Sequence, residues 1–208
     1  MNVNRILQHE PTMRNRAEAG VTLAPHLQHL DHDAVTLVSI SDHSAEVARE
    51  IAEHLDMPHV PMFVRTLHLS DKQPHCFGAF AEGDHYLLDH DMIRSCSVEL
   101  EQVEKELDKL QQDYAQWHAR FRRQPLHESL HGRIAVIVED VLACALTIQV
   151  ATQAVRRCDP SKIIIAAPVA SPDLADALQN RVDEVICPLQ PRHTEPAERW
   201  FHTPEPVH

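Results

Sequence analysis

Three nearly continuous apolar runs, each followed by a turn or a segment with helical spacing, constrain the fold of this chain more than any other feature. The runs are AVTLVSI (34–40), GRIAVIVED (132–140) and SKIIIAAPVA (161–170). A strand that is apolar throughout is typical of a parallel sheet, because helices cover both faces of such a sheet. The alternation of these strands with helices predicts a doubly wound α/β fold with a mainly parallel sheet, which binds ligands beyond the carboxyl ends of its strands.

Shorter segments between these runs extend the alternation. AEVAREIAEHL (45–55) has helical spacing and HVPMFVRTL (59–67) resumes as a strand, which completes a βαβ unit. Two short apolar segments flank Gly83-Asp84 and predict an antiparallel hairpin over 75–89. The remaining predicted elements are a helix at 14–30 that contains Pro25, helices at 144–158 and 171–180, and a strand at 182–189.

A charged segment without Pro or Gly carries the strongest periodic signal. Up to Phe121 its apolar residues recur at alternating spacings of three and four, which predicts one long helix over 92–121 with a single apolar seam. We expect the seam to pack against the same chain; pairing with a second copy, in a homodimer, is the alternative. The seam residues are Leu100, Val103, Leu107, Leu110, Tyr114, Trp117 and Phe121.

Length and composition agree with a single domain over 1–208. A chain of 208 residues with 43% hydrophobic content can bury a core without disulfides or a structural metal. We expect a core formed by 34–67 and 132–189, a small hood at 68–90, the long helix at 92–121 and an irregular tail at 190–208.

Charge and cysteine usage narrow the class of protein. Acidic residues exceed Lys plus Arg by 31 to 19, and no basic run forms the positive surface that nucleic acids or anionic membranes attract. The five cysteines are odd in number and never spaced as CxxC, which argues against a disulfide framework and favours the reducing cytoplasm. The first residues lack the apolar core of a signal peptide, and no run reaches the roughly 18 apolar residues of a membrane span.

The clearest candidate site follows the second apolar run. This strand delivers Glu139 and Asp140 to its carboxyl end, and the chain then turns into a helix whose unpaired N–H groups favour an anion. Carboxylates can accept hydrogen bonds from vicinal hydroxyls while the helix N-terminus binds a phosphate. The segment therefore suits a sugar phosphate, with the ribose at Glu139 and Asp140 and the phosphate at Leu142, Ala143, Cys144, Ala145, Leu146 and Thr147.

This stretch resembles the signature of the type I phosphoribosyltransferases, which is an apolar strand, two acids, three variable positions and Thr-Gly-x-Thr. Glu139, Asp140 and Thr147 match the signature, whereas Cys144 stands where Thr is usual and Ala145 where Gly is usual. The resemblance implies the phosphoribosyltransferase fold. For an active member it also implies Mg²⁺ on the pyrophosphate and ribose hydroxyls, with Asp140 as the catalytic candidate.

The chain is similar in particular to a bacterial subgroup of this family that carries a helical insertion in mid-sequence. The similar stretches occur in the same order as in that subgroup and cover most of the chain. They are RNRAEAGVTLA with Arg16, Ala19, Gly20 and Leu23, then FVRTLH (63–68), FGAFAEG (77–83), IIIAAPVASPD (163–173) and the pair Trp200-Phe201.

The loop after the first core strand departs from the family pattern. Active members have a loop close to Leu-Pro-Arg-Gly-Gly-Val, which would bind the departing pyrophosphate through its amides and Arg. Here Ser41, Asp42 and His43 form the remnant of that loop, together with Arg65, which precedes Thr66 where the family has Lys. A carboxylate beside an anion of about three charges costs on the order of several kcal/mol in a partly desolvated site.

We therefore expect a phosphoribosyltransferase-like protein that binds a ribose 5-phosphate or nucleotide at 139–147, with transfer activity weakened or lost. One alternative is an active transferase that uses phosphoribosyl pyrophosphate and a nitrogenous base; another is a non-catalytic, partner-binding subunit. A hypothesis from another class is thiol-based hydrolysis, with Cys144 at a helix N-terminus and His43 as its base. We expect no resident metal at the Asp-His-Asp triplets 31–33 and 89–91, because three consecutive residues cannot all face one ion.

Overall fold

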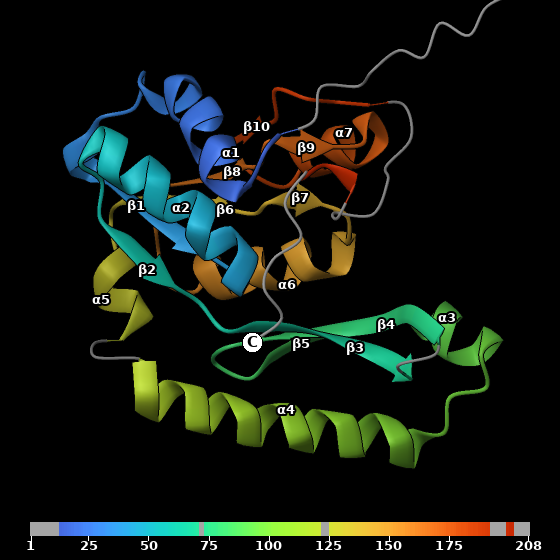
Figure 1. Ribbon diagram of the computed structural model, residues 1–208. Helices are drawn as coiled ribbons and strands as arrows, with labels where there is room; N and C mark the ends of the chain where they lie inside the picture. The colour runs from blue at the N-terminus through green and yellow to red at the C-terminus, as the bar shows by residue number, and fades with distance from the viewer. Residues whose placement is uncertain (1–12, 71–72, 122–124, 192–198, 202–208) are drawn as a thin grey trace, which may run out of the picture.

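A five-stranded parallel sheet forms the centre of the computed structural model, which describes residues 13–70, 73–121, 125–191 and 199–201. The strand order is β10-β8-β6-β1-β2, and the neighbouring strands are parallel (Figure 1). This arrangement confirms the predicted α/β fold and its parallel sheet. The strands are β1 (Val35–Ser39), β2 (His59–Pro61), β6 (Ile134–Val138), β8 (Lys162–Ala166) and β10 (Glu184–Ile186).

Helices cover both faces of this sheet, as a doubly wound fold requires. One face packs against α1 (Arg16–Leu23) and α2 (Asp42–Leu55), and the other against α5 (Leu126–Leu130), α6 (Ala145–Arg156) and α7 (Pro172–Gln179). The strands β1, β6 and β8 are buried on both faces, which explains why their sequences are nearly continuous apolar runs.

The N-terminal helix is shorter in the structure than the predicted helix at 14–30. Because Pro25 lacks an N–H group and fixes φ, α1 ends at Leu23 and the chain continues as a 3-10 helix, η1 (Ala24–Leu27). A second 3-10 turn, η2 (His32–Ala34), leads into β1. Within α1, a Cβ at Gly20 would lie 2.7 Å from the carbonyl oxygen of Val47, so this glycine allows α1 to approach α2 closely.

A three-stranded antiparallel sheet forms the hood, and it begins earlier than the sequence predicts. The expected strand at 59–67 divides at residues 62 and 63: its first part is β2 of the central sheet, and its second part begins β3 (Val64–Ser70). The predicted hairpin is confirmed, since β4 (Gln73–Ala81) pairs with β5 (His85–Leu88) and its turn contains Gly83 and Asp84 at positive φ.

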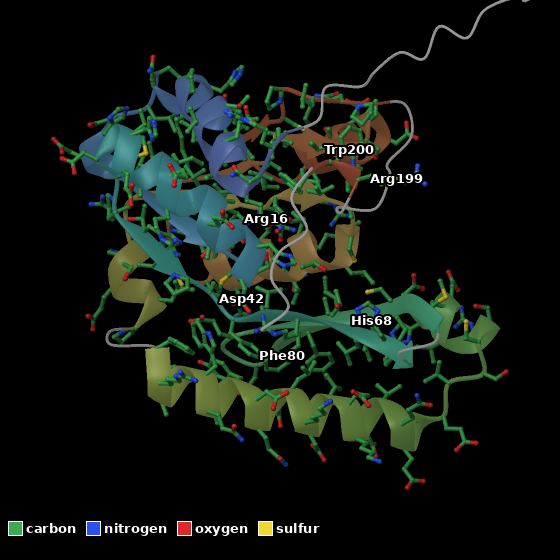
Figure 2. All side chains as sticks on the ribbon, viewed as in Figure 1. Arg16, Asp42, His68, Phe80, Arg199 and Trp200 are labelled. Carbon is green, nitrogen blue, oxygen red and sulfur yellow. The ribbon has the colours of Figure 1, made fainter. Side chains whose placement is uncertain are left out.

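The expected long helix over 92–121 is two helices in the structure, α3 (His90–Ser95) and α4 (Leu100–Phe121). Ser97, between them, has positive φ, which a continuous helix does not allow. The apolar seam of α4 packs on the hood sheet, and Phe80 of β4 lies between the two (Figure 2). Val103 and Leu110 are buried there, which confirms packing within the chain, whereas Leu100 and Phe121 at the helix ends are 72% and 52% exposed.

Two further segments lie near the carboxyl edge of the central sheet. The short strands β7 (Val141–Leu142) and β9 (Val169–Ala170) pair in parallel beyond β6 and β8. Trp200 and Phe201, in the segment predicted to be an irregular tail, are buried beside α1. Among the described helices, none combines the length and the apolar character needed to span a bilayer.

Candidate functional site

The two predicted acids, Glu139 and Asp140, lie at the carboxyl end of β6 and are buried, with exposed fractions of 8% and 5%. Arg16 extends from α1 (Figure 2). Its Nε donates to Oδ2 of Asp140 at 2.8 Å. Oδ1 of Asp140 accepts a hydrogen bond from the N–H of Val141 at 2.9 Å. Both oxygens of Asp140 therefore already accept hydrogen bonds from the protein.

Glu139 is held by the loop that follows β1. Its Oε1 accepts hydrogen bonds from Ser41 Oγ at 2.9 Å and from the N–H of Asp140 at 3.0 Å. Burial, followed by the neighbouring charge of Asp140, raises the pKa of Glu139 well above the usual glutamate range. The pair thus favours one negative charge over two, and that charge faces the guanidinium of Arg16.

The remnant of the pyrophosphate loop forms a serine capping box at the start of α2. Ser41 Oγ accepts from the N–H of Ser44, and Ser44 Oγ accepts from the N–H groups of Ile40 and Ser41 at 3.0 and 2.9 Å. These amides lie at the carboxyl end of β1. In this loop they donate to serine hydroxyls of the same chain.

The other predicted residues of the loop differ in how close they lie to the acids. Asp42 is exposed in the first turn of α2, and the Nδ1 atom of His43 lies 4.0 Å from Oδ2 of Asp140. Arg65 is on hood strand β3, where its guanidinium stacks 4.7 Å from the ring centroid of Phe63 and donates to the carbonyl of Val64. The structure therefore brings Ser41 and His43 to the acid pair, while Arg65 contacts the hood.

The predicted phosphate segment, Leu142 to Thr147, ends in the first turn of α6. Leu142 is buried in β7, Ala143 is exposed, and Cys144 is the N-cap of the helix. Ala145 is the first helical residue, so the replacement of the usual glycine meets no left-handed backbone here. Oγ1 of Thr147 is buried, and among the described residues no nitrogen or oxygen atom forms a hydrogen bond with it. It interacts instead with the sulfur of Cys144.

Cys144 is paired with Cys76 of hood strand β4, with 3.6 Å between the two sulfurs. The pKa of Cys144 is lowered, chiefly by its hydrogen bond with Cys76 and also by the Thr147 hydroxyl and the amides of Thr147 and Leu146. His43, the base suggested for thiol-based hydrolysis, instead approaches Asp140. The described partner of the Cys144 sulfur is therefore another thiol and not the histidine that thiol-based hydrolysis would use.

The acid pair already has a positive partner in this arrangement. The Arg16 guanidinium lies 2.8 Å from Oδ2 of Asp140, so a divalent cation bound directly by this carboxylate would have to use its remaining lone pairs or displace Arg16. Elsewhere in the part of the chain that the structure describes, no group of three or more His, Cys, Asp or Glu side chains is arranged to hold a metal ion. Asp89, in one Asp-His-Asp triplet, caps α3 instead.

Sequence reasoning assigned no chemical role to Arg16 or Cys76. For Arg16 the spacing carried a signal, because Arg16, Ala19, Gly20 and Leu23 are all buried and follow a helical i, i+3, i+4, i+7 pattern. An arginine on the buried face of a helix needs a buried acid as partner. Cys76 had no such signal, since it lies 68 residues from Cys144 on an antiparallel strand.

A separate polar cavity of about 410 Å³ lies at the opposite edge of the sheet. Arg156, Asp159, Lys162 and Arg181 are among its lining residues, and Lys162 is the first residue of β8. Because β6 and β8 are parallel, this cavity is near the amino ends of the strands, away from Glu139 and Asp140. Substitutions in this cavity can therefore serve as controls, because they leave the acid pair unchanged.

The fold and this acid pair define an α/β protein whose candidate site lies at the carboxyl ends of parallel strands. Residues 90–198, just over half of the chain, match the family model of the phosphoribosyl transferase domain. The chain therefore belongs to the phosphoribosyl transferase family.

Two curated relatives carry the name of the same family. Two curated sequences of Mycobacterium tuberculosis, from strains CDC 1551 and H37Rv, are provisionally named phosphoribosyl transferases and are 32% identical to this chain over 181 residues. The match covers 85% of this chain but 40% of each relative, so the chain spans less than half of the length of these relatives.

Similar folds are found among solved structures. TT1426 from Thermus thermophilus superposes with a TM-score of 0.71 at 24% identity, covering 95% of this chain and 93% of that chain. The AQ2163 protein from Aquifex aeolicus has a TM-score of 0.50 at 13% identity, covering 83% of this chain and 73% of that chain. At these identities the likeness concerns the fold.

Proposed function

We propose that this chain binds a ribose 5-phosphate or a nucleotide at residues 139–147 and transfers the phosphoribosyl group weakly or not at all. The observation that supports weak transfer most is the serine capping box after β1. Its amides at Ile40, Ser41 and Ser44 donate to serine hydroxyls of the same chain. A pyrophosphate would have to displace each of these hydrogen bonds, at a cost of about 1 kcal/mol for each bond.

Charge at the same loop supports this proposal. Asp42 is exposed in the first turn of α2, where the helix N-terminus would otherwise attract an anion. Its carboxylate neutralises part of that attraction and repels a pyrophosphate. Arg65, whose family counterpart precedes a phosphate-binding Lys, stacks on Phe63 in the hood. The half of the site that would bind the leaving group therefore offers little positive charge from these residues.

The N-terminus of α6 supports retained phosphate binding. The amides of Leu146 and Thr147 and the Thr147 hydroxyl are directed at the sulfur of Cys144. A neutral thiol is a weak acceptor, so a phosphate oxygen can replace the Cys144 sulfur once that sulfur carries a proton, and the negative phosphate itself favours the protonated thiol. The ribose hydroxyls would then reach Asp140 and Glu139 by sharing or replacing the contacts to Arg16 and Ser41.

Calorimetric titration tests the proposal with three probes: ribose 5-phosphate, a nucleoside monophosphate, and phosphoribosyl pyrophosphate with Mg²⁺. We expect one of the first two to bind without Mg²⁺, and no pyrophosphate release from the third in the presence of purine or pyrimidine bases. Mg²⁺-dependent release of pyrophosphate would overturn the claim of lost transfer. Silent titrations with all three would overturn ligand binding and favour the non-catalytic, partner-binding subunit.

A matched pair of variants locates the binding site. Thr147→Val removes one hydroxyl at the start of α6 and should weaken phosphate binding by about tenfold, the equivalent of one hydrogen bond. Asp159→Asn is the control, because Asp159 lines the cavity at the opposite edge of the sheet and asparagine tolerates the positive φ of this position. The affinity of this variant for the phosphate ligand should equal that of the wild type. Equal losses in both variants would place the ligand elsewhere.

A further inference from the structure

Two cysteines from distant parts of the chain meet between the hood and the core. Cys76 is on β4 and Cys144 is the N-cap of α6, and their Sγ atoms are 3.6 Å apart. Both are free thiols and both are half-buried. The distance corresponds to hydrogen-bonded sulfurs, and formation of a disulfide of about 2.0 Å would require the two Sγ atoms to move closer together.

The surroundings of the two sulfurs differ in a way that assigns them different roles. The hydrogen bond between the two thiols, followed by the Thr147 hydroxyl and the amides of Thr147 and Leu146, lowers the pKa of Cys144. The hydrogen bond to Cys144, together with burial, raises the pKa of Cys76. Of the two sulfurs, Cys144 is therefore the one that ionises first, and Cys76 is the one that keeps its proton.

We propose that Cys76 and Cys144 form a redox-active pair that a hydroperoxide oxidises to an intramolecular disulfide. The Cys144 thiolate attacks the nearer peroxide oxygen, the O–O bond breaks, and the products are a sulfenic acid on Cys144 and hydroxide, or alkoxide from an organic peroxide. Cys76 then attacks the Cys144 sulfur, and the sulfenic oxygen leaves as water with the proton of Cys76. With hydrogen peroxide, two thiols lose two electrons and the peroxide becomes two waters.

The first step also prepares the second. The hydrogen bond to Cys144 is the largest cause of the raised pKa of Cys76, and this cause disappears when the thiolate becomes a sulfenic acid. Cys76 is then a better nucleophile than in the reduced pair. The resulting bond would link hood strand β4 covalently to the first turn of α6, two elements that already pack together.

Thiol counting and peptide mapping of the wild-type chain test this proposal directly. After stoichiometric hydrogen peroxide, the five cysteines of the chain should react as two fewer thiols, and a thiol reductant should restore them. Mapping should join the peptides that contain Cys76 and Cys144. A disulfide between other cysteines, or an unchanged thiol count, would overturn the proposal without the use of any variant.

Three substitutions then separate the roles of the sulfurs. Cys76→Ser should form no disulfide but should accumulate a sulfenic acid on Cys144, which dimedone traps; Cys144→Ser should form neither product. Cys96→Ser removes an exposed thiol outside the pair and should oxidise as the wild type does. Trapping at Cys76 in the Cys144→Ser variant, in place of Cys144, would reverse the assigned roles.

The pH dependence of the oxidation rate provides an independent check. Because the pKa of Cys144 is lowered, its oxidation rate should change little between about pH 6 and about pH 8, whereas the rate for a small free thiol such as glutathione should rise over this range. A rate for Cys144 that rises in parallel with that of the free thiol would contradict the proposal. None of these measurements needs a sugar phosphate, so they stand or fail separately from the proposed function.

Discussion

Single residues determine the charge of the candidate site. Arg16, Asp140 and Glu139 are all buried, and two of them form an ion pair. Removing one partner of a buried pair leaves an uncompensated charge, which is more costly than the net contribution of the intact pair. The burial of this group therefore makes its stability sensitive both to substitution and to pH.

Arg16→Met keeps most of the side-chain volume and removes the charge that faces Asp140. We expect the free energy of unfolding, measured with urea, to fall by about 3–5 kcal/mol. The double variant with Asp140→Asn should recover part of this loss, because no buried carboxylate then lacks its partner. Arg14→Ala, at a neighbouring arginine whose side chain is 80% exposed in its pair with Glu18, should cost less than about 1 kcal/mol. A similar small cost for Arg16→Met would contradict the structure.

Glu139 gives stability a pH dependence of known sign. Its folded-state pKa is raised, so above the ordinary value of 4.5 the folded chain retains a proton that the unfolded chain loses. Stability from this group therefore falls as pH rises from about 4.5 towards the folded-state pKa. Relative to wild type, Glu139→Gln should gain stability over this range in urea titrations at successive pH values. A constant difference between the two proteins would show that the pKa is not raised.

At the scale of elements, the first turns of two helices set the geometry of the site. The capping box of α2 orients Ser41 towards Glu139, and the first turn of α6 surrounds the sulfur of Cys144. Helix α4 has a different role, since its seam covers the outer face of the hood sheet. Its contribution to stability should therefore depend on which turn of the helix is changed.

Two leucines of α4 provide a matched comparison. Leu110→Ala removes a side chain that is 8% exposed and packed on the hood, so unfolding should become easier by about 2–5 kcal/mol. Leu100→Ala removes the same atoms at a position that is 72% exposed, and the change should be within about 0.5 kcal/mol. Chemical denaturation of both variants checks the prediction, and equal effects would argue against the observed orientation of the seam.

At the scale of the whole molecule, three parts meet around the carboxyl edge of the central sheet: α1, the hood and the segment that contains Trp200 and Phe201. The ring of Phe201 lies beneath the guanidinium of Arg16, with 4.7 Å from the Cζ atom to the ring centroid. The carbonyl of Trp200 accepts a hydrogen bond from the N–H of Met13. Residues near the two ends of the chain thus pack against the helix that positions Arg16. The position of Arg16 in the candidate site therefore depends on contacts between segments that are far apart in the sequence.

Trp200→Ala should destabilise the whole fold, because the side chain is 2% exposed in the core beside α1. Truncations of this size cost about 3–5 kcal/mol, which for a chain of 208 residues lowers Tm by several degrees. Phe121→Ala, at a ring that is 52% exposed, is the control and should change Tm much less. A thermal melt in which the two variants are equally affected would rule out the docking of Trp200.

Local sequence determined the fold class and the position of the acid pair. The burial of β6 on both faces is recorded in its continuous apolar run, and the residues directly after such a strand must lie at the carboxyl edge of the sheet. The helix start at Ser171 was visible because capping depends on side chains a few residues apart, whereas α2 begins at Asp42, three residues before the predicted helix at 45–55.

Tertiary structure alone decided which side chains meet. Arg16 and Asp140 are 124 residues apart, Ser41 and Glu139 are 98 apart, and Cys76 and Cys144 are 68 apart. The division of 59–67 between two sheets likewise followed from pairing with β1 on one side and β4 on the other. Periodicity reports the face that a residue occupies on its own element, whereas these contacts depend on how separate elements pack, which no local pattern encodes.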